Sequence, residues 1–158
     1  MNVNMKLRSM RAFRVVIAAV ALATSAVLLW SASGSDCRMV VSGASGVLQF
    51  DSASLPAGQA QSYCYTDAAG RKLRFILARG SDGQVRSVFD ACRQCYVYHR
   101  GFRVAAGELI CRVCGNHYPI DHMMTGKASC VPENLPHQES GQSVRIKISD
   151  LKSGRALF

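Results

Sequence analysis

The chain has 158 residues, the length of one ordinary domain with a short additional segment. Its 19 Lys and Arg against 10 Asp and Glu give a formal net charge of +9 at pH 7, which is compatible with a nucleic-acid or anionic-membrane partner. Part of that charge lies in an acid-free leader, and the rest is scattered without an arginine-rich tract or a recognisable nucleic-acid-binding motif. We therefore exclude nucleic acid as a partner.

An uncharged apolar segment follows the basic leader of residues 1–14. Residues 15–32 approach the roughly 20 apolar residues that a transmembrane helix needs, and the positive-inside rule places the leader in the cytoplasm and the remaining chain across the membrane. The same segment also fits a cleaved signal, because Ser31, Ala32 and Ser33 suit a signal peptidase. Both interpretations predict an exported, cysteine-rich metal-binding domain at 46–158, behind a Ser/Gly-rich linker at 33–45.

The body is predicted to be mainly β, with a small α+β arrangement as the alternative, and no part of it is typical of a long amphipathic helix. Turns are expected at Asp67–Gly70, Ser81–Gly83 and Ala105–Gly107, the last of which closes a hairpin. In chain order, the predicted strands are Val47–Phe50, Tyr63–Tyr65, Leu73–Leu77, Val85–Phe89, Phe102–Val104, Glu108–Ile110 and Val144–Ile148.

Two CxxC pairs stand in the middle of the body. Cys92 and Cys95 form the first pair, Cys111 and Cys114 form the second, and fifteen residues separate them. Two intervening residues allow both sulfurs of a pair to face one centre, so this spacing is typical of two knuckles around a tetrahedral metal. Gly115 supplies the permissive backbone that a tight knuckle turn needs. We therefore expect one N-terminal transmembrane helix followed by a compact strand-rich domain with two CxxC knuckles.

Further candidate ligands lie beyond the second pair. Cys130 is a fifth thiol, which we expect to replace a ligand, to belong to a cluster or second metal, or to act as a redox partner. Imidazole and thioether groups nearby widen the choice toward copper and some iron centres. These groups belong to His117, His122, Met123 and Met124. Cys37 and Cys64 receive no role from the sequence.

The cysteine pattern admits metal binding, structural disulfides or thiol–disulfide exchange. Two matched pairs favour metal, because a catalytic redox site typically has one CxxC and because disulfides seldom form within such a short spacing. Zinc, iron, an iron-sulfur cluster and copper remain open as the bound group. We see no catalytic triad, phosphate-binding glycine loop or paired carboxylates in the sequence, so a non-enzymatic electron carrier or metal-binding protein without an organic substrate is expected.

A longer pattern surrounds these cysteines. It consists of the phrase FDACRQCY ending at Tyr96, then Gly101-Phe102, Gly107-Glu108, the second pair with Gly115, Tyr118-Pro119 and Cys130. From about Tyr63 to Pro136 the chain resembles the FtrD-like membrane iron-sulfur containing proteins. The resemblance implies a periplasm-facing domain with an iron-sulfur or other redox metal centre. The family's cysteine positions fall on Cys92, Cys95, Cys111, Cys114 and Cys130.

The resemblance also implies a role in moving electrons during bacterial iron uptake. The expected location is the bacterial inner membrane, with a single span and the C-terminal domain in the periplasm. Because many relatives have several spans and this chain has one, a membrane partner is expected, namely an iron permease or another membrane redox protein. The alternatives are a structural zinc-ribbon or copper- or iron-handling module of a membrane complex, and a thiol–disulfide exchange protein. Arg93 and Arg112, inside the two pairs, are expected to favour the reduced state of a redox centre.

Overall fold

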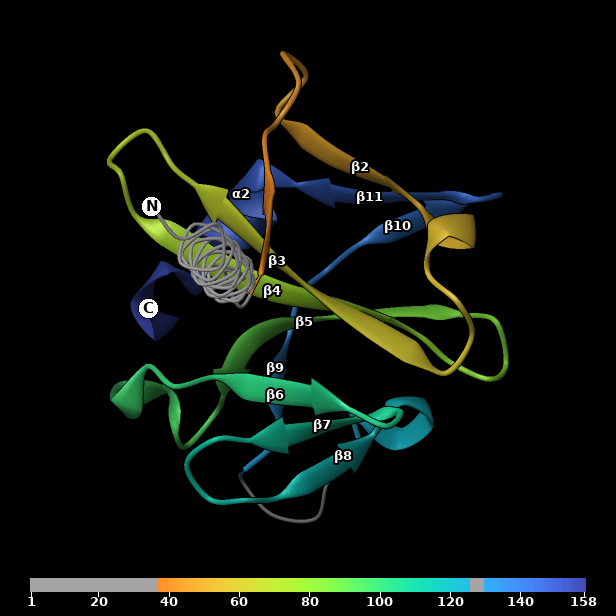
Figure 1. Cartoon of the computed structure of the whole chain (residues 1–158). Coiled ribbons are helices and arrows are strands. Elements are labelled where there is room, and N and C mark those ends of the chain that lie inside the picture. Colours follow the sequence, from red (N-terminus) through yellow and green to blue (C-terminus); the bar gives the residue numbers. More distant parts are fainter. Residues whose placement is uncertain (1–36, 126–129) are drawn as a thin grey trace, which may run out of the picture. The chain divides into compact units, whose positions relative to one another are not determined.

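Short strands dominate the fold (Figure 1). The structure is a computed structural model that describes residues 37–125 and 130–158. The strands are β1 Arg38–Val40, β2 Val47–Asp51, β3 Gln59–Thr66, β4 Lys72–Arg79, β5 Val85–Cys92, β6 Phe102–Ala105, β7 Glu108–Cys111, β8 His117–Pro119, β9 Pro132–Asn134, β10 Gln138–Ser140 and β11 Ser143–Lys147. The helical elements are η1 Ser52–Ser54, η2 Tyr96–Tyr98, η3 Ile120–His122, α2 Ile148–Ser153 and η4 Gly154–Leu157. The expected strand-rich domain with few helices is therefore confirmed, and each predicted strand is found with shifted ends.

The central sheet has five strands in the order β1-β3-β4-β5-β9. β3, β4 and β5 are consecutive antiparallel neighbours, whereas β1 runs parallel to β3, and β9 runs antiparallel to β5. The turns predicted at residues 67–70 and 81–83 join these strands. At the first turn the Asp67 carboxylate accepts hydrogen bonds from the N–H groups of Ala69 and Arg71, at 2.9 and 3.0 Å, which stabilises the chain reversal.

Other strands cover both faces of the central sheet, so the fold has three layers (Figure 1). Along β4, Phe75 and Leu77 belong to one apolar core and Ile76 and Ala78 belong to the other, as the two-residue period of a strand requires. All of these side chains are buried. Burial on both faces explains the unbroken apolar run in the middle of β4.

One face of the central sheet packs on a second, antiparallel sheet of order β10-β11-β2. Leu48 of β2 and Ile146 of β11 are direct partners, and both are buried in the core that this sheet shares with the central one. Leu151 of α2 joins the same core. The last predicted strand ends one residue early, at Lys147, because Ile148 begins α2.

The opposite face packs on a third sheet of order β6-β7-β8, which carries the second CxxC pair. β6 and β7 form the predicted hairpin, with Phe102 opposite Cys111. Leu109 of β7 is fully buried in a core that also contains Val88 of β5 and Cys92 at the end of β5. The third sheet therefore lies against the face of β5 to which Cys92 belongs.

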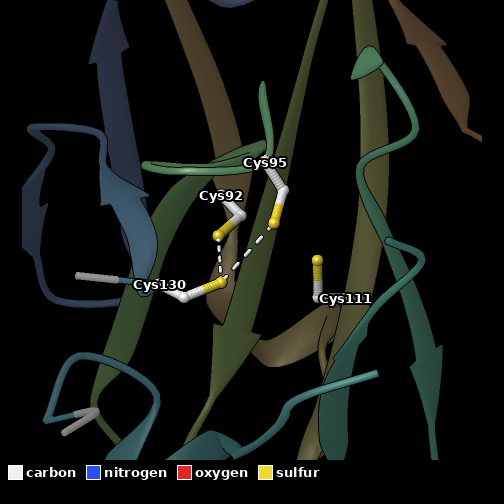
Figure 2. Close-up of side chains that lie close together, drawn as sticks. All are labelled: Cys92, Cys95, Cys111 and Cys130. Atoms are coloured by element: carbon white, nitrogen blue, oxygen red, sulfur yellow. Dashed lines mark hydrogen bonds between the residues drawn. The ribbon is translucent and has the colours of Figure 1, made fainter. Parts of the chain in front are cut away.

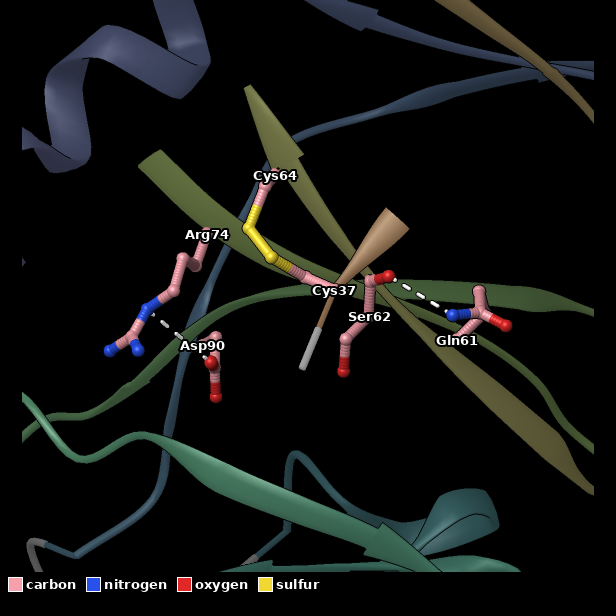
Figure 3. Close-up of a disulfide and its surroundings, with 6 residues drawn as sticks. All are labelled: Cys37, Gln61, Ser62, Cys64, Arg74 and Asp90. Carbon is pink, nitrogen blue, oxygen red and sulfur yellow. Dashed lines mark hydrogen bonds and ion pairs between the residues drawn. A yellow bond between two sulfur atoms is a disulfide. The ribbon is translucent and has the colours of Figure 1, made fainter. Parts of the chain in front are cut away.

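The described residues begin with a disulfide between Cys37 and Cys64, whose Cα atoms are 5.6 Å apart (Figure 3). It ties the start of β1 to β3 and settles the pairing that the sequence left open. β1 lies within residues 33–45, where a linker was expected. Among the described residues no helix is long and apolar enough to cross a membrane. The anchor or signal expected at 15–32 lies outside the described residues.

Candidate metal centre

The two CxxC pairs share one local design. Cys92 is the last residue of β5 and Cys111 is the last residue of β7, and each is followed by a turn that contains the second cysteine of its pair. In the second turn the N–H of Gly115 donates to the Cys111 carbonyl at 3.0 Å, and Gly115 has a φ of 73°. Glycine adopts this left-handed conformation without a steric penalty, so the predicted role of Gly115 is confirmed.

Cys130 reaches the two pairs through strand pairing. β9 begins just after Cys130 and runs antiparallel to β5, with Pro132 opposite Cys92. The hydroxyl of Tyr118, on β8, donates to the Cys130 carbonyl. Cys130 is thus held by β5 on one side and by the third sheet on the other, which places its thiol between the two knuckles.

Five free thiols converge at this point, and four of them are drawn in Figure 2. Four of their sulfurs lie within 4.8 Å of one another, those of Cys92, Cys95, Cys111 and Cys130. Cys130 Sγ is 2.8 Å from Cys92 Sγ and 3.6 Å from Cys95 Sγ. It is 3.2 Å from Cys114 Sγ. Sulfurs bound at about 2.3 Å to one tetrahedral ion lie roughly 3.8 Å apart, so this cluster is compact enough for a single ion once the closest sulfurs separate.

The thiols differ in exposure: Cys92 and Cys111 are buried, Cys95 and Cys130 are half-buried, and Cys114 is exposed. Burial raises the pKa of the Cys95 thiol, and its hydrogen bond with Cys130 raises that pKa further. A thiol with a raised pKa keeps its proton at neutral pH unless a cation replaces it. Metal binding here is therefore expected to release protons and to strengthen as the pH rises.

A buried carboxylate anchors the first knuckle. Asp90 lies two residues before Cys92, and its Oδ1 accepts a hydrogen bond from the N–H of Phe102 at 2.6 Å, which joins β5 to β6. Arg74 of β4 pairs with Asp90 at 3.6 Å (Figure 3). A side chain at Gly101 would clash with the Asp90 carboxylate, so glycine is required at this close approach. These contacts hold β6 against the strand that carries Cys92.

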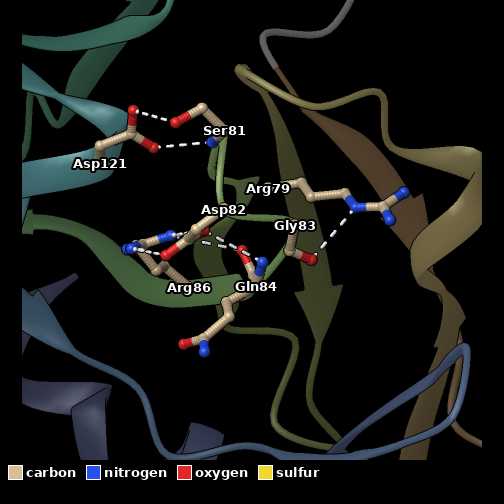
Figure 4. Close-up of polar contacts among 7 residues, drawn as sticks. All are labelled: Arg79, Ser81, Asp82, Gly83, Gln84, Arg86 and Asp121. Carbon is tan, nitrogen blue, oxygen red and sulfur yellow. Dashed lines mark hydrogen bonds and ion pairs between the residues drawn. The ribbon is translucent and has the colours of Figure 1, made fainter.

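A second anchor joins the third layer to the β4–β5 turn (Figure 4). The Asp121 carboxylate of η3 accepts hydrogen bonds from the N–H and the hydroxyl of Ser81, both at 2.8 Å. In the same turn Asp82 pairs with Arg86 at 2.7 Å. The Arg86 hydrogen bond lowers the pKa of Asp82 to about 2, and the Ser81 N–H lowers the pKa of Asp121. Both carboxylates are therefore charged at neutral pH.

The other candidate ligands lie outside the compact sulfur group. His117 Nδ1 is 2.8 Å from Glu108 Oε1, and His122 is exposed. Met123 is fully buried in the core between β5 and the third sheet, and Met124 is 41% exposed. Within the described residues the compact group contains neither histidine. The donor set is therefore all sulfur, which suits zinc, copper(I) and iron-sulfur clusters.

The arginines inside the two pairs have other partners. Arg93 pairs with Glu133 at 2.9 Å, and Arg112 donates to the Phe102 carbonyl at 3.0 Å. The carboxylate of Glu133 offsets the charge of Arg93.

Sequence reasoning assigned no role to Asp90 or Tyr118. Both belong to the pattern that carries the family resemblance, and this was the signal available for finding them. Their partners, the Phe102 N–H and the Cys130 carbonyl, are backbone groups. A sequence pattern does not identify such partners, because every residue except proline offers both groups.

Comparisons with solved structures and curated proteins add little to this picture. Five solved chains match, and one of them is a quaternary ammonium Rieske monooxygenase, CntA, in complex with an inhibitor. It has a TM-score of 0.41 and 15% sequence identity, and the match covers 62% of this chain and 30% of that chain. This similarity is too low to support an argument. A comparison with curated proteins found no match.

A family comparison gives a stronger result. The profile of the family described as "Membrane iron-sulfur containing protein FtrD-like" matches residues 55–158. The match spans all five cysteines of the candidate centre and more than half of the chain. This chain therefore belongs to the FtrD-like family of membrane iron-sulfur containing proteins.

Proposed function

We propose that this chain is a membrane-tethered electron carrier of the periplasm, which holds an iron-sulfur cluster or iron on its cysteines and supports iron uptake. The observation that carries the proposal is the convergence of five free thiols, four of them within 4.8 Å of one another. An all-sulfur donor set suits iron-sulfur clusters. The description of the family as iron-sulfur containing supports the same group.

The disulfide supports a location outside the cytoplasm. Cys37 and Cys64 are joined, and disulfides form and persist in oxidising compartments. In the same domain the five remaining cysteines are unpaired, although several of their sulfurs are close together. Such thiols would be exposed to oxidation in the periplasm unless a metal held them. A disulfide and five free thiols in one domain thus favour a metal-loaded site on the outer side of the inner membrane.

The cysteines serve as ligands in this proposal. When bound, an iron-sulfur cluster supplies a reversible one-electron couple. The buried Cys92 and Cys111 hold the inner side of the site away from water, whereas Cys114 is exposed and its neighbour Val113 is 37% exposed. The centre therefore lies near the surface on the side of the second knuckle, where a redox partner can approach it.

The proposed reaction needs an electron donor and an iron acceptor. The carrier takes one electron from a membrane redox protein and passes it to ferric iron, which becomes ferrous iron for uptake through an iron permease. The segment at 15–32 acts as the tether, and tethering raises the effective concentration of the domain near membrane partners. The thiolates remain ligands throughout, so no bond to carbon forms or breaks on the protein.

Metal and acid-labile sulfide analysis of the full chain, purified anaerobically in detergent, tests this proposal. Visible absorption spectra before and after dithionite complete the measurement. Iron with sulfide, and a visible band that bleaches on reduction, would support electron transfer. Stoichiometric zinc without a visible band would contradict it and favour the structural zinc-ribbon alternative. The Cys111→Ser variant is the control, and we expect it to lose both the iron and the band.

A further inference from the structure

The candidate centre contains more thiols than a bound group needs. A tetrahedral zinc ion takes four thiolates, and so do [2Fe–2S] and [4Fe–4S] clusters. Five free cysteines converge on the site. A group that takes four thiolates therefore leaves one thiol over, and the structure limits which one it is.

Three of the five thiols have fixed places. Cys92 and Cys111 are buried, and each ends a strand that is paired within a sheet. Cys95 belongs to the compact group with both of them. Removing Cys92 or Cys111 would take a sulfur from the buried, inner side of the site.

The remaining two thiols compete for the outer side. Cys114 is the counterpart of Cys95 in the second CxxC turn, which makes it a ligand by the design of the knuckle. The compact group of four, however, contains Cys130 in place of Cys114. The two sulfurs are 3.2 Å apart. Each of them thus reaches the same part of the site.

We propose that Cys114 and Cys130 are interchangeable ligands that share one coordination position, so that a loaded site always leaves one of these two thiols free. This inference rests on the proposed four-thiolate centre. The free thiol lies at the surface, because Cys114 is exposed and Cys130 is half-buried. It is the site at which an alkylating reagent modifies the loaded protein, and the exchange allows one ligand to be displaced without loss of the bound group.

Metal content of serine variants tests the exchange. The full chain is purified anaerobically in detergent as wild type, Cys114→Ser, Cys130→Ser, the double variant and Cys92→Ser. We expect each single variant at the shared position to keep at least about four-fifths of the wild-type metal. The double variant and Cys92→Ser are expected to lose most of it. Loss of metal in Cys114→Ser or in Cys130→Ser alone, to the level of Cys92→Ser, would overturn the shared position.

Alkylation of the wild type gives a second readout that does not depend on a variant folding. The loaded protein is treated with N-ethylmaleimide, and the modified residues are mapped by mass spectrometry. We expect about one equivalent of label, divided between Cys114 and Cys130, and about five equivalents after unfolding and chelation. Label confined to one of the two residues would overturn the exchange while leaving the four-thiolate centre intact. Wild-type protein without bound metal, or full metal content in Cys92→Ser, would instead overturn the proposed function and this inference together.

Discussion

The two sides of the central sheet are held in different ways. On the side of β2, β11 and α2, the core consists of large apolar side chains, among them Phe75, Leu48 and Ile146. On the other side the strands β6, β7 and β8 have only four, four and three residues, and the buried set includes the candidate ligands Cys92 and Cys111. Small units with little apolar surface commonly need a metal or a disulfide for stability. The comparison leads us to expect that the first region folds on apolar burial alone, whereas the second region also depends on the proposed metal.

Cys111→Ser is expected to have the largest effect, because it removes a buried ligand from the second region. Metal binding contributes on the order of 10 kcal/mol to folding in small thiolate domains, so we expect loss of metal and local unfolding of β6, β7 and β8. β2 and β11 should keep their protection in hydrogen exchange measured by mass spectrometry. Equal loss of protection in all three sheets would contradict the division into two regions.

Phe75→Ala probes the apolar side. Phe75 is fully buried and its ring centroid is 5.5 Å from that of Tyr63, so its removal should cost about 3–5 kcal/mol in the free energy of unfolding. Metal bound per folded molecule should stay unchanged, as shown by denaturant titration with metal analysis of the folded fraction. The matched variant is Leu109→Ala in the other core, which should destabilise the protein and also weaken metal retention. Metal loss from folded Phe75→Ala would show that the two sides are coupled.

Replacing Cys37 and Cys64 together by serine tests whether the edge of the central sheet stabilises the fold independently of the candidate site. The disulfide joins residues separated by 27 positions, and closing a loop of this size contributes about 3 kcal/mol. We expect a loss of this size in urea unfolding, with metal content equal to wild type. A fall in metal content would show that the edge of the central sheet and the candidate site are coupled.

Asp90→Ala tests the link between the two regions. The variant leaves the buried N–H of Phe102 without its acceptor and removes the partner of Arg74, which should cost about 2–3 kcal/mol. The Phe102 amide should exchange faster in NMR hydrogen-exchange measurements. Asp90→Asn keeps an acceptor oxygen and should lose less. Equal exchange rates in the wild type and the alanine variant would show that the carboxylate does not hold β6.

Acid is expected to have the smallest effect, at the β4–β5 turn. The folded-state pKa of Asp82 is lowered to about 2, below the ordinary value of 3.8, so its ion pair with Arg86 stabilises the fold above that ordinary value. The stabilisation is lost as the pH falls toward 2. The Gln84 amide, which donates to Asp82, should therefore titrate in NMR spectra with a midpoint near 2. The Asp82→Asn variant should lack this transition, and a wild-type midpoint at the ordinary value would refute the assignment.

Much of the fold could be predicted from local patterns. Short apolar runs between turn signals identified the strands at Leu73–Leu77 and Val85–Phe89, and both strands are buried over most of their length. The turn at Asp67–Gly70 was predictable because the aspartate and glycine favour this backbone geometry. The end of the last strand was not, since Ile148 packs equally well from the first turn of a helix.

The candidate site also has parts that the sequence predicted and parts that it did not. The sequence by itself determined the two CxxC pairs and Gly115 as parts of knuckle turns, because a spacing of two residues restricts where both sulfurs of a pair can point. The sequence named Cys130 as a candidate ligand through the family resemblance, but only the tertiary structure decided that its sulfur lies beside the two pairs and that Cys37 bonds with Cys64. Both outcomes depend on pairing between strands far apart in the chain, β5 with β9 and β1 with β3. Such pairing is selected by the packing of whole layers, which no local pattern of residues encodes.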